Sequence, residues 1–261
     1  MSENNPYQAP SASLIGTEET AGLGAPRTVS AGQGANWIGI GFKLFGRGWL
    51  LWILAGIAAF VLTVITSMIP LVGAFIQMVV ITILCGGCMV ASQVLDRGDD
   101  ARFGDFFSGF SIAPGPLALL GLLYMGGNIL AMLAAFLVGM LTGLGTGVLS
   151  ALSDDPAMMM SNMSGPILIM ALVYLAVLVP MAMAYWFAPA LITLNRIPVF
   201  QAIALSFQAC LKNIVPFLVF GLIGLVLLIL GALPAGLGLL VVMPVLFAST
   251  YVAYKDIFQI A

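Results

Sequence analysis

Two cysteines spaced C-x-x-C are the first candidates for chemistry in this sequence. Cys85 and Cys88 flank a pair of glycines, and this spacing occurs in redox-active dithiols and in metal sites. Two thiolates supply only half of a tetrahedral zinc site, and the chain has no histidine to complete it. Small residues also let membrane helices approach closely. We therefore favour helix packing for this motif and leave metal binding open.

Methionines beside carboxylates form a second candidate site. The segment 153–163 reads SDDPAMMMSNM, with Met158, Met159, Met160 and Met163 after the acidic pair. Thioethers prefer Cu(I), which makes copper handling one hypothesis. Adjacent methionines cannot all point the same way, and methionine commonly fills gaps in apolar surroundings. We favour an ordinary, partly embedded loop and leave copper binding by Met158–Met163 open.

Acidic residues gather in the segment 96–105, which also holds Arg97 and Arg102. Six of the 18 charged residues lie in this short stretch, and mixed charges in one loop are usually solvated. An enzyme needs an acid, base or nucleophile set positioned in a pocket, and we find none. The sequence therefore predicts no catalytic residues, no cofactor and no enzymatic activity.

Asn128 is the most polar group deep in an apolar segment, and Tyr124 lies one helical turn before it. Polar groups in hydrocarbon usually face the helix bundle and bond one another, but they also line substrate cavities. We predict an intramembrane polar site at Tyr124 and Asn128 and favour the first role.

The composition decides where these residues must sit. Hydrophobic residues make up 62% of the 261 residues and charged residues 7%, with a mean hydropathy of +1.15. A soluble domain is about a quarter charged and cannot hide this much apolar surface. The net charge of −2 argues against a nucleic-acid partner. The sequence predicts a multi-pass membrane protein with the lipid bilayer as its surroundings.

Six apolar segments are long enough to cross about 30 Å of hydrocarbon. The expected fold is all-α, a bundle of six transmembrane helices in a domain covering 36–261. The polar, Pro- and Ser-containing stretch 1–35 is expected to be a disordered cytoplasmic tail. The predicted spans are 49–69, 71–95, 117–141, 167–192, 215–233 and 234–254.

The basic residues predict the orientation of the bundle. With six spans, all eight Lys and Arg residues fall on one side of the membrane. Cytoplasmic loops are enriched in Lys and Arg, so both termini are expected in the cytoplasm of a bacterial cell and the spans in its inner membrane.

Aromatic stripes predict cytoplasmic helices that lie in the membrane interface. Phe103, Phe106, Phe107 and Phe110 share one helical face by their i, i+3, i+4, i+7 spacing. The same helical spacing of apolar residues recurs at Phe200, Ile203 and Phe207. Such helices place their apolar face in lipid or under the bundle. With Arg97, Arg196 and Lys255 beside them, these residues are the candidate membrane-interface or partner-binding set.

The residues that precede the interfacial helices also suggest internal repeats. Asp96-Arg97 and Asn195-Arg196 occupy equivalent places before the second and third interfacial helices, and the chain ends in YVAYKDIF. We predict three diverged copies of one unit, an interfacial helix followed by a helical hairpin.

The segments GFKLFGRGWLLWIL, GGCMVASQVLDRGDDARFGDFFSGF and YVAYKDIF give the chain a resemblance to a known family. The chain resembles the uncharacterised six-helix bacterial inner-membrane proteins, which include the YciC-like proteins and the membrane domain of glycerophosphodiester phosphodiesterases. The resemblance covers about residues 36–261. It implies a helical integral membrane protein and supplies no catalytic residues.

Two functional hypotheses follow. The first is a non-enzymatic inner-membrane protein that organises or binds lipid or partner membrane proteins. The alternative is a transporter or permease for an uncharged or amphiphilic small solute. Ion-coupled carriers generally keep ionisable residues within the membrane, and the six spans contain none, which favours the first.

Overall fold

The structure, a computed structural model, describes residues 25–70, 72–151 and 156–260. Every regular element within these ranges is a helix, as the sequence predicts. The elements are α1 (Gln33–Arg47), α2 (Trp49–Ser67), α3 (Val72–Asp96), the 3₁₀ helix η1 (Phe103–Phe107), α4 (Gly109–Ile112), α5 (Pro114–Ala151), α6 (Pro156–Trp186), α7 (Ala188–Asn195), α8 (Val199–Lys212), α9 (Ile214–Ala232) and α10 (Leu239–Ile257).

Six helical stretches are long and apolar enough to span a membrane, which confirms the predicted number. They are Trp49–Ser67, Val72–Asp96, Pro114–Gly145, Ser164–Asn195, Ile214–Ala232 and Leu239–Ile257. The two middle stretches are longer than predicted, and the last begins five residues later because the turn after α9 is longer. The fourth contains a break at Phe187, just before Pro189, because proline cannot continue the backbone ladder of α6.

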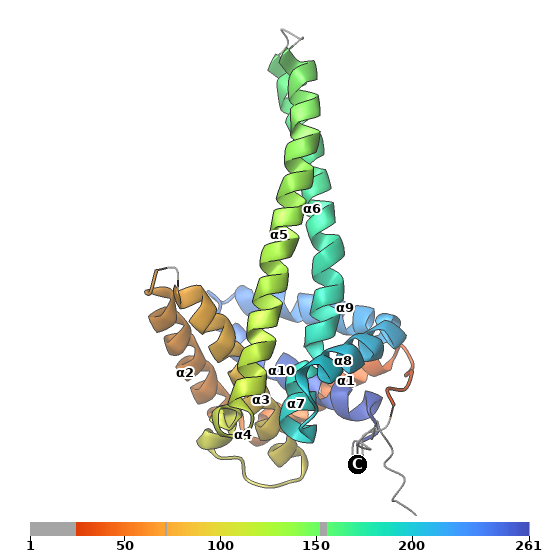
Figure 1. Cartoon of the computed structure of the whole chain (residues 1–261). Coiled ribbons are helices and arrows are strands. Elements are labelled where there is room, and N and C mark those ends of the chain that lie inside the picture. Colours follow the sequence, from red (N-terminus) through yellow and green to blue (C-terminus); the bar gives the residue numbers. More distant parts are fainter. Residues whose placement is uncertain (1–24, 71, 152–155, 261) are drawn as a thin grey trace, which may run out of the picture.

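The spans form three helical hairpins, α2–α3, α5–α6 and α9–α10. Figure 1 shows α5 and α6 running side by side and standing well above the other two hairpins. At about 1.5 Å per residue, the 38 residues of α5 extend much further than the 19 residues of α2. The apolar side chains of these helices are largely exposed, as expected for helices surrounded by lipid.

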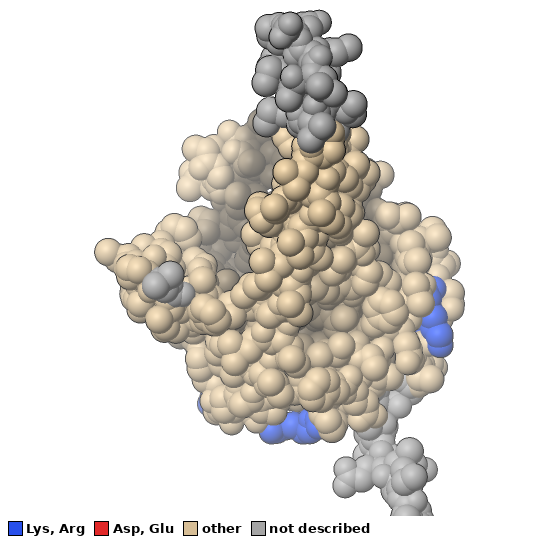
Figure 2. Space-filling model, turned by 45° about the horizontal axis from the view of Figure 1, so that its top comes forward, with Lys and Arg blue, Asp and Glu red and all other residues tan. Residues whose placement is uncertain are grey.

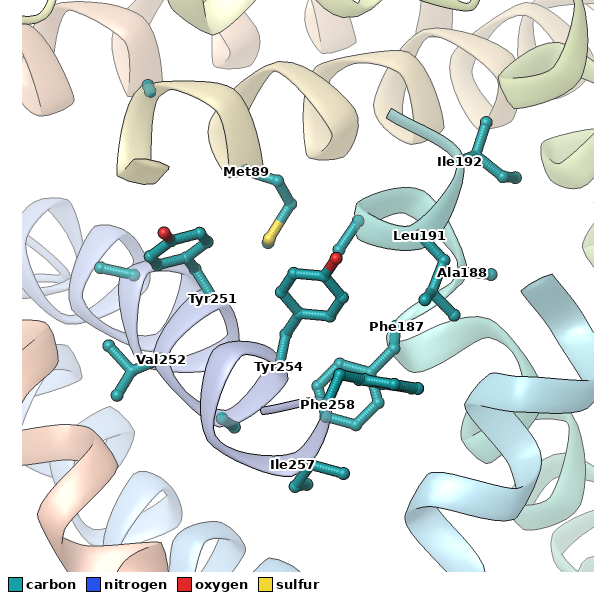
Figure 3. Close-up of a cluster of buried hydrophobic side chains, with 14 of the residues drawn as sticks. Met89, Phe187, Ala188, Leu191, Ile192, Tyr251, Val252, Tyr254, Ile257 and Phe258 are labelled. Atoms are coloured by element: carbon teal, nitrogen blue, oxygen red, sulfur yellow. The ribbon is translucent and has the colours of Figure 1, made fainter. Parts of the chain in front are cut away.

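The core lies where α3, α7 and α10 meet. Met89, Leu191 and Tyr254 are buried there, one from each helix. Figure 3 shows Tyr254 between Met89 on one side and Phe187 and Leu191 on the other. The Phe187 ring also packs at right angles to that of Phe258, with centroids 5.9 Å apart. The second helix of each hairpin therefore points its end toward a common centre.

Short helices at one end of the bundle hold the hairpins together. α1 packs along α10 and α9, η1 packs on α3, and α8 packs on α6. Charged residues gather at this same end. On the face seen in Figure 2, basic side chains lie along the bottom and on the right flank, and none is visible on the described part of the projecting hairpin. We call this end the basic end.

The predicted tail 1–35 lies mostly outside the described residues. Its last part is described and contacts the bundle. The Arg27 guanidinium pairs with the Asp256 carboxylate, and the backbone N–H of Val29 donates to Asn213 Oδ1 at 2.9 Å. α1 then starts at Gln33, inside the range that the sequence assigned to the tail.

Candidate functional site

The glycines between Cys85 and Cys88 are close-contact positions. A Cβ atom on Gly87 would lie 2.0 Å from the Phe106 carbonyl oxygen, and one on Gly86 would lie 2.6 Å from Thr193 Oγ1. The pair therefore lets η1 and α7 approach the backbone of α3. This favours the packing interpretation of the motif.

No metal-binding cluster occurs in the described part of the chain, where no three His, Cys, Asp or Glu side chains converge. Met158–Met163 fall in the first turns of α6, but their side chains lie outside the described set. The third cysteine, Cys210 on α8, is buried, and burial raises the pKa of its thiol to about 12. It stays protonated near neutral pH and is a poor nucleophile or metal ligand.

The predicted amphipathic helix over 103–110 is wrong in its local structure. The segment forms the 3₁₀ helix η1 followed by the single turn of α4. Phe106 is buried at 1% exposure, whereas Phe103 and Phe110 are each 43% exposed and Phe107 is half-buried. Gly109 allows α4 to approach α3 closely, since a Cβ atom there would lie 2.1 Å from the Ile83 carbonyl oxygen. The four rings therefore do not share one face.

The predicted stripe of α8 does not lie on one exposed face. Phe200 is 70% exposed, whereas Phe207 is half-buried and Ile203 is half-buried against the core. The buried face carries the small residues Ala202, Ser206 and Ala209. Phe200 is thus available to lipid, while the packing face of α8 was missed because its side chains are small.

Ser206 occupies the break between α6 and α7. Its hydroxyl accepts a hydrogen bond from the Phe187 N–H at 2.9 Å and donates to the Met183 carbonyl at 2.7 Å. These two backbone groups are four residues apart and would bond each other in an unbroken helix. Insertion of a side chain into the ladder in this way is a recognised cause of a helix break.

The three predicted basic residues have different surroundings. Lys255 Nζ donates to Asp96 Oδ2 at 2.7 Å, so it pairs within the protein. Arg196 Nη1 donates to the Ile112 carbonyl, and its backbone caps α7 in the left-handed conformation. Arg97 is exposed at the end of α3. Arg97 and Arg196 remain accessible at the basic end.

A polar junction at the basic end was largely missed by the sequence prediction. Asp96 Oδ2 also accepts from the Tyr251 hydroxyl at 3.3 Å, and Tyr254 donates to Asn195 Oδ1. Asp96 and Asn195 are the residues that the predicted repeats align. The spacing Tyr-x-x-Tyr-Lys in α10 was the signal that could have predicted these contacts. It places one tyrosine hydroxyl beside Asp96 and the other beside Asn195.

The junction borders a hollow of about 520 Å³ between α1, the end of α3 and the end of α10. Four charged groups line it as two pairs, Arg27 with Asp256 and Lys255 with Asp96. The Trp37 indole N–H adds a bond of 2.9 Å to Asp256 Oδ2. The contacts of Asp256 join the chain's N-terminal part to α10, and the Lys255–Asp96 pair joins α10 to the end of α3.

The predicted polar site in the membrane lies within the α5–α6 hairpin. The Tyr174 hydroxyl donates to Asn128 Oδ1 at 3.1 Å, and Asn128 Nδ2 donates to the Tyr124 carbonyl at 3.1 Å. The Tyr124 ring packs against Tyr185, whose hydroxyl shares a 2.8 Å hydrogen bond with Thr82. Tyr124 lines a cavity of about 180 Å³, and Asn128 is not among the residues that line it.

An apolar cleft separates the hairpins above the core. It has a volume of about 330 Å³ and uncharged lining residues, among them Trp186, which is 40% exposed at its edge. The Thr250 hydroxyl in its wall is bonded to the Leu246 carbonyl of its own helix. The complete lining is Cys85, Met89, Tyr185, Trp186, Pro189, Phe220, Met243, Leu246, Phe247 and Thr250.

A second apolar cavity, of about 210 Å³, adjoins the cleft. The two share Cys85, Met243 and Phe247. Ligand sites commonly fall between about 300 and 1,000 Å³ and are mostly apolar. Together, the cleft and its neighbour have the size and the apolar lining of such a site.

Comparison with known proteins gives one informative relative. A curated protein of Burkholderia thailandensis, described as a probable inner membrane protein, is 30% identical over 226 residues. The match covers 85% of this chain and 82% of that protein. No protein-family model matches the chain, and no solved structure matches it.

Proposed function

The chain belongs to the family of this probable inner membrane protein, and on that premise we propose that it binds and organises lipid, or partner membrane proteins, without catalysing a reaction. Its six apolar helices make it a multi-pass inner-membrane protein. The more specific likeness to the YciC-like proteins and the phosphodiesterase membrane domain belongs to this proposal.

The observation that carries the proposal is the apolar cleft. It lies between three hairpins, its lining has no charged group, and its hydroxyl groups already have partners. Trp186 and Met243 are exposed at its edge, so the cleft opens toward the surroundings of the helices. In a bilayer these surroundings are acyl chains, which are the nearest apolar molecules able to enter.

The exposed surface of the α5–α6 hairpin supports the partner-binding half of the proposal. The described apolar side chains along it, such as Leu130, Leu141 and Leu168, are more than half exposed. In Figure 1, no other described helix lies beside the part of this hairpin that stands above the other two hairpins. Membrane helices associate through such surfaces when close packing replaces lipid contacts.

The basic end supports an interfacial position and a cytoplasmic orientation. α1, η1 and α8 gather there with the charged residues, and Phe200 of α8 is exposed. Cationic residues near anionic lipid contribute about 1 kcal/mol each. We propose that Arg97 and Arg196 contact headgroups there, with both termini in the cytoplasm.

The contacts of the short helices support the proposed threefold repeat. Each packs on the last span of the preceding unit: η1 on α3, α8 on α6, and α1 on α10. This closes a ring of three units. Small residues make each contact close, Gly87 at the first, Ser206 at the second and Gly41 at the third.

Lipid retention tests the proposed function. The protein is purified in a mild detergent and its bound lipid is measured by native mass spectrometry, for the wild type and for Cys85→Phe. Cys85 lines both apolar cavities, so a larger side chain there is expected to lower the amount of bound lipid.

Leu168→Phe is the matched control, because Leu168 is 60% exposed on α6 and lines neither cavity. Equal lipid retention in the wild type and both variants contradicts binding in the cleft. Absence of retained lipid in the wild type contradicts the lipid-binding function itself.

Transport of an uncharged or amphiphilic solute stays a second hypothesis. The observation that favours it is the position of the cleft between hairpins that separate above the core. The bond between Asn128 and Tyr174 lies within one hairpin, which favours a structural role for that site. Solute flux into liposomes tests the hypothesis, compared between the wild type and Cys85→Phe, with Asn128→Leu as the control outside the cleft.

A further inference from the structure

The smaller apolar cavity lies between α2, α3, η1 and α10, beside the basic end. Its lining is almost wholly apolar. The lining residues are Trp52, Ala55, Gly56, Ala59, Ile81, Leu84, Cys85, Cys88, Phe106, Phe107, Met243, Pro244 and Phe247.

Trp52 is the exception to this apolar lining. Its side chain is buried at 2% exposure, and its indole N–H has no acceptor among the described residues. The Phe106 ring packs at 81° to it with centroids 4.8 Å apart, which holds the indole in place. By contrast, the buried Trp37 donates to Asp256.

An unpaired donor of this kind destabilises the folded protein. A buried N–H without an acceptor costs about 1–3 kcal/mol, and hydrocarbon offers no water to replace the missing acceptor. A water molecule in the cavity is a poor substitute, because a buried water needs two to four polar partners. The donor therefore calls for an occupant that is apolar and carries an acceptor oxygen.

The position of Trp52 along the membrane normal identifies such an occupant. Trp52 lies about 4–5 Å along the helix axis from the start of α2 at Trp49, near the headgroups of the basic end. Ala59 lines the other end of the cavity, about 15 Å from the same start. That depth matches about half of the 30 Å hydrocarbon core. Trp52 thus brings a buried, unpaired donor to the wall of the cavity near headgroup depth, with apolar lining below it.

We propose that this cavity binds an acyl chain of a glycerophospholipid, with the Trp52 indole N–H donating to the ester carbonyl of that chain. The proposal rests on the lipid-binding function proposed above and adds a site and a donor. The ester lies at the shallow end and the methylene groups occupy the deep end. Cys85 and Cys88 serve as part of the apolar wall.

Ester-linked and ether-linked lipids test the donor directly. Full-length protein in detergent is titrated with diacyl phosphatidylglycerol and with the dialkyl ether lipid of the same headgroup, which lacks the carbonyl. Thermal unfolding reports binding. The wild type is expected to need about tenfold less of the ester lipid than of the ether lipid for the same stabilisation, as the loss of one buried hydrogen bond implies.

The variant Trp52→Phe keeps an aromatic ring and removes the N–H. It is expected to lose the ester preference while still responding to both lipids. Without added lipid it is expected to unfold no earlier than the wild type, because it carries no unpaired donor. Trp49→Phe is the control, since Trp49 is 54% exposed and lines neither apolar cavity, and it is expected to keep the preference.

The outcomes separate the two proposals. An equal response of the wild type to ester and ether lipids, or an unchanged preference in Trp52→Phe, overturns the carbonyl contact and leaves lipid binding intact. No stabilisation of the wild type by either lipid overturns both proposals.

Discussion

Small side chains make the closest contacts between the units of this protein. Gly41 of α1 faces Ser249 of α10, where an added Cβ would lie 2.0 Å from its hydroxyl oxygen, and Gly87 of α3 faces the backbone of η1 at the same distance. At the third contact the Ser206 hydroxyl joins α8 to the break in α6. Since lipid supplies no hydrophobic drive for helix association, close packing and buried hydrogen bonds must stabilise these contacts.

Gly87→Val is expected to destabilise the bundle. The new side chain would meet the Phe106 carbonyl oxygen and force η1 away from α3. Overpacking of this kind costs about 1–3 kcal/mol, so thermal unfolding in detergent should occur at a lower temperature. Gly126→Ala is the control, because no atom lies within 4 Å of a Cβ at that position. A Gly87→Val protein as stable as the control would contradict the close contact.

Ser206→Ala removes both hydrogen bonds at the helix break and leaves two buried backbone groups unpaired. We expect a loss of about 1–3 kcal/mol in stability, measured as a lower unfolding midpoint. Ser111→Ala is the matched control, since Ser111 is exposed and bonds only within its own turn. If the two variants have the same unfolding midpoint, the hydrogen bonds of Ser206 do not stabilise the helix break.

Among the elements, the spans could be predicted well and the short helices only in part. An uninterrupted apolar run such as 215–233 has one stable structure in lipid, a helix. The segment 103–110 has helical spacing of its phenylalanines, but its geometry depends on contacts with α3 at Gly87 and Gly109. The packing face of α8 is made of Ala and Ser, which no hydrophobic pattern reveals. The cavity at Trp52 depends on four elements and has no local signature.

The N-terminal segment is held by the Arg27–Asp256 pair, by Lys212 and by the amide side chain of Asn213. Asn213 donates to the carbonyls of Arg27 and Ala209, and its Oδ1 accepts from Val29. Asn213→Ala is expected to release the segment, so trypsin should cleave after Arg27 faster, by about tenfold for a loss near 1.4 kcal/mol. The Asn36→Ala variant should be cleaved at the wild-type rate, because Asn36 is exposed and its side chain bonds to Gln33 of the same helix. Equal rates for all three proteins would show that other contacts hold the segment.

At the scale of the whole molecule, the basic end is the rigid part and the other end is open. The two ion pairs, the tyrosines of α10 and the short helices all lie at the basic end. The hairpins separate above it and leave apolar cavities between them. This arrangement joins the ends of three hairpins and leaves apolar spaces between their outer parts, which we propose are filled by lipid.

The orientation of the molecule gives the last prediction. All eight Lys and Arg residues lie outside the two short turns near residues 70 and 235 and outside the segment 152–155. The positive-inside rule therefore predicts that the basic end lies in the cytoplasm. Green fluorescent protein fused after residue 261 is expected to fluoresce, and alkaline phosphatase fused there is expected to be inactive. Phosphatase inserted after Ala235, in the turn between α9 and α10, is expected to be active because it reaches the opposite side. The reverse pattern would place Arg97 and Arg196 outside the cell and would remove the anionic cytoplasmic leaflet as their binding surface.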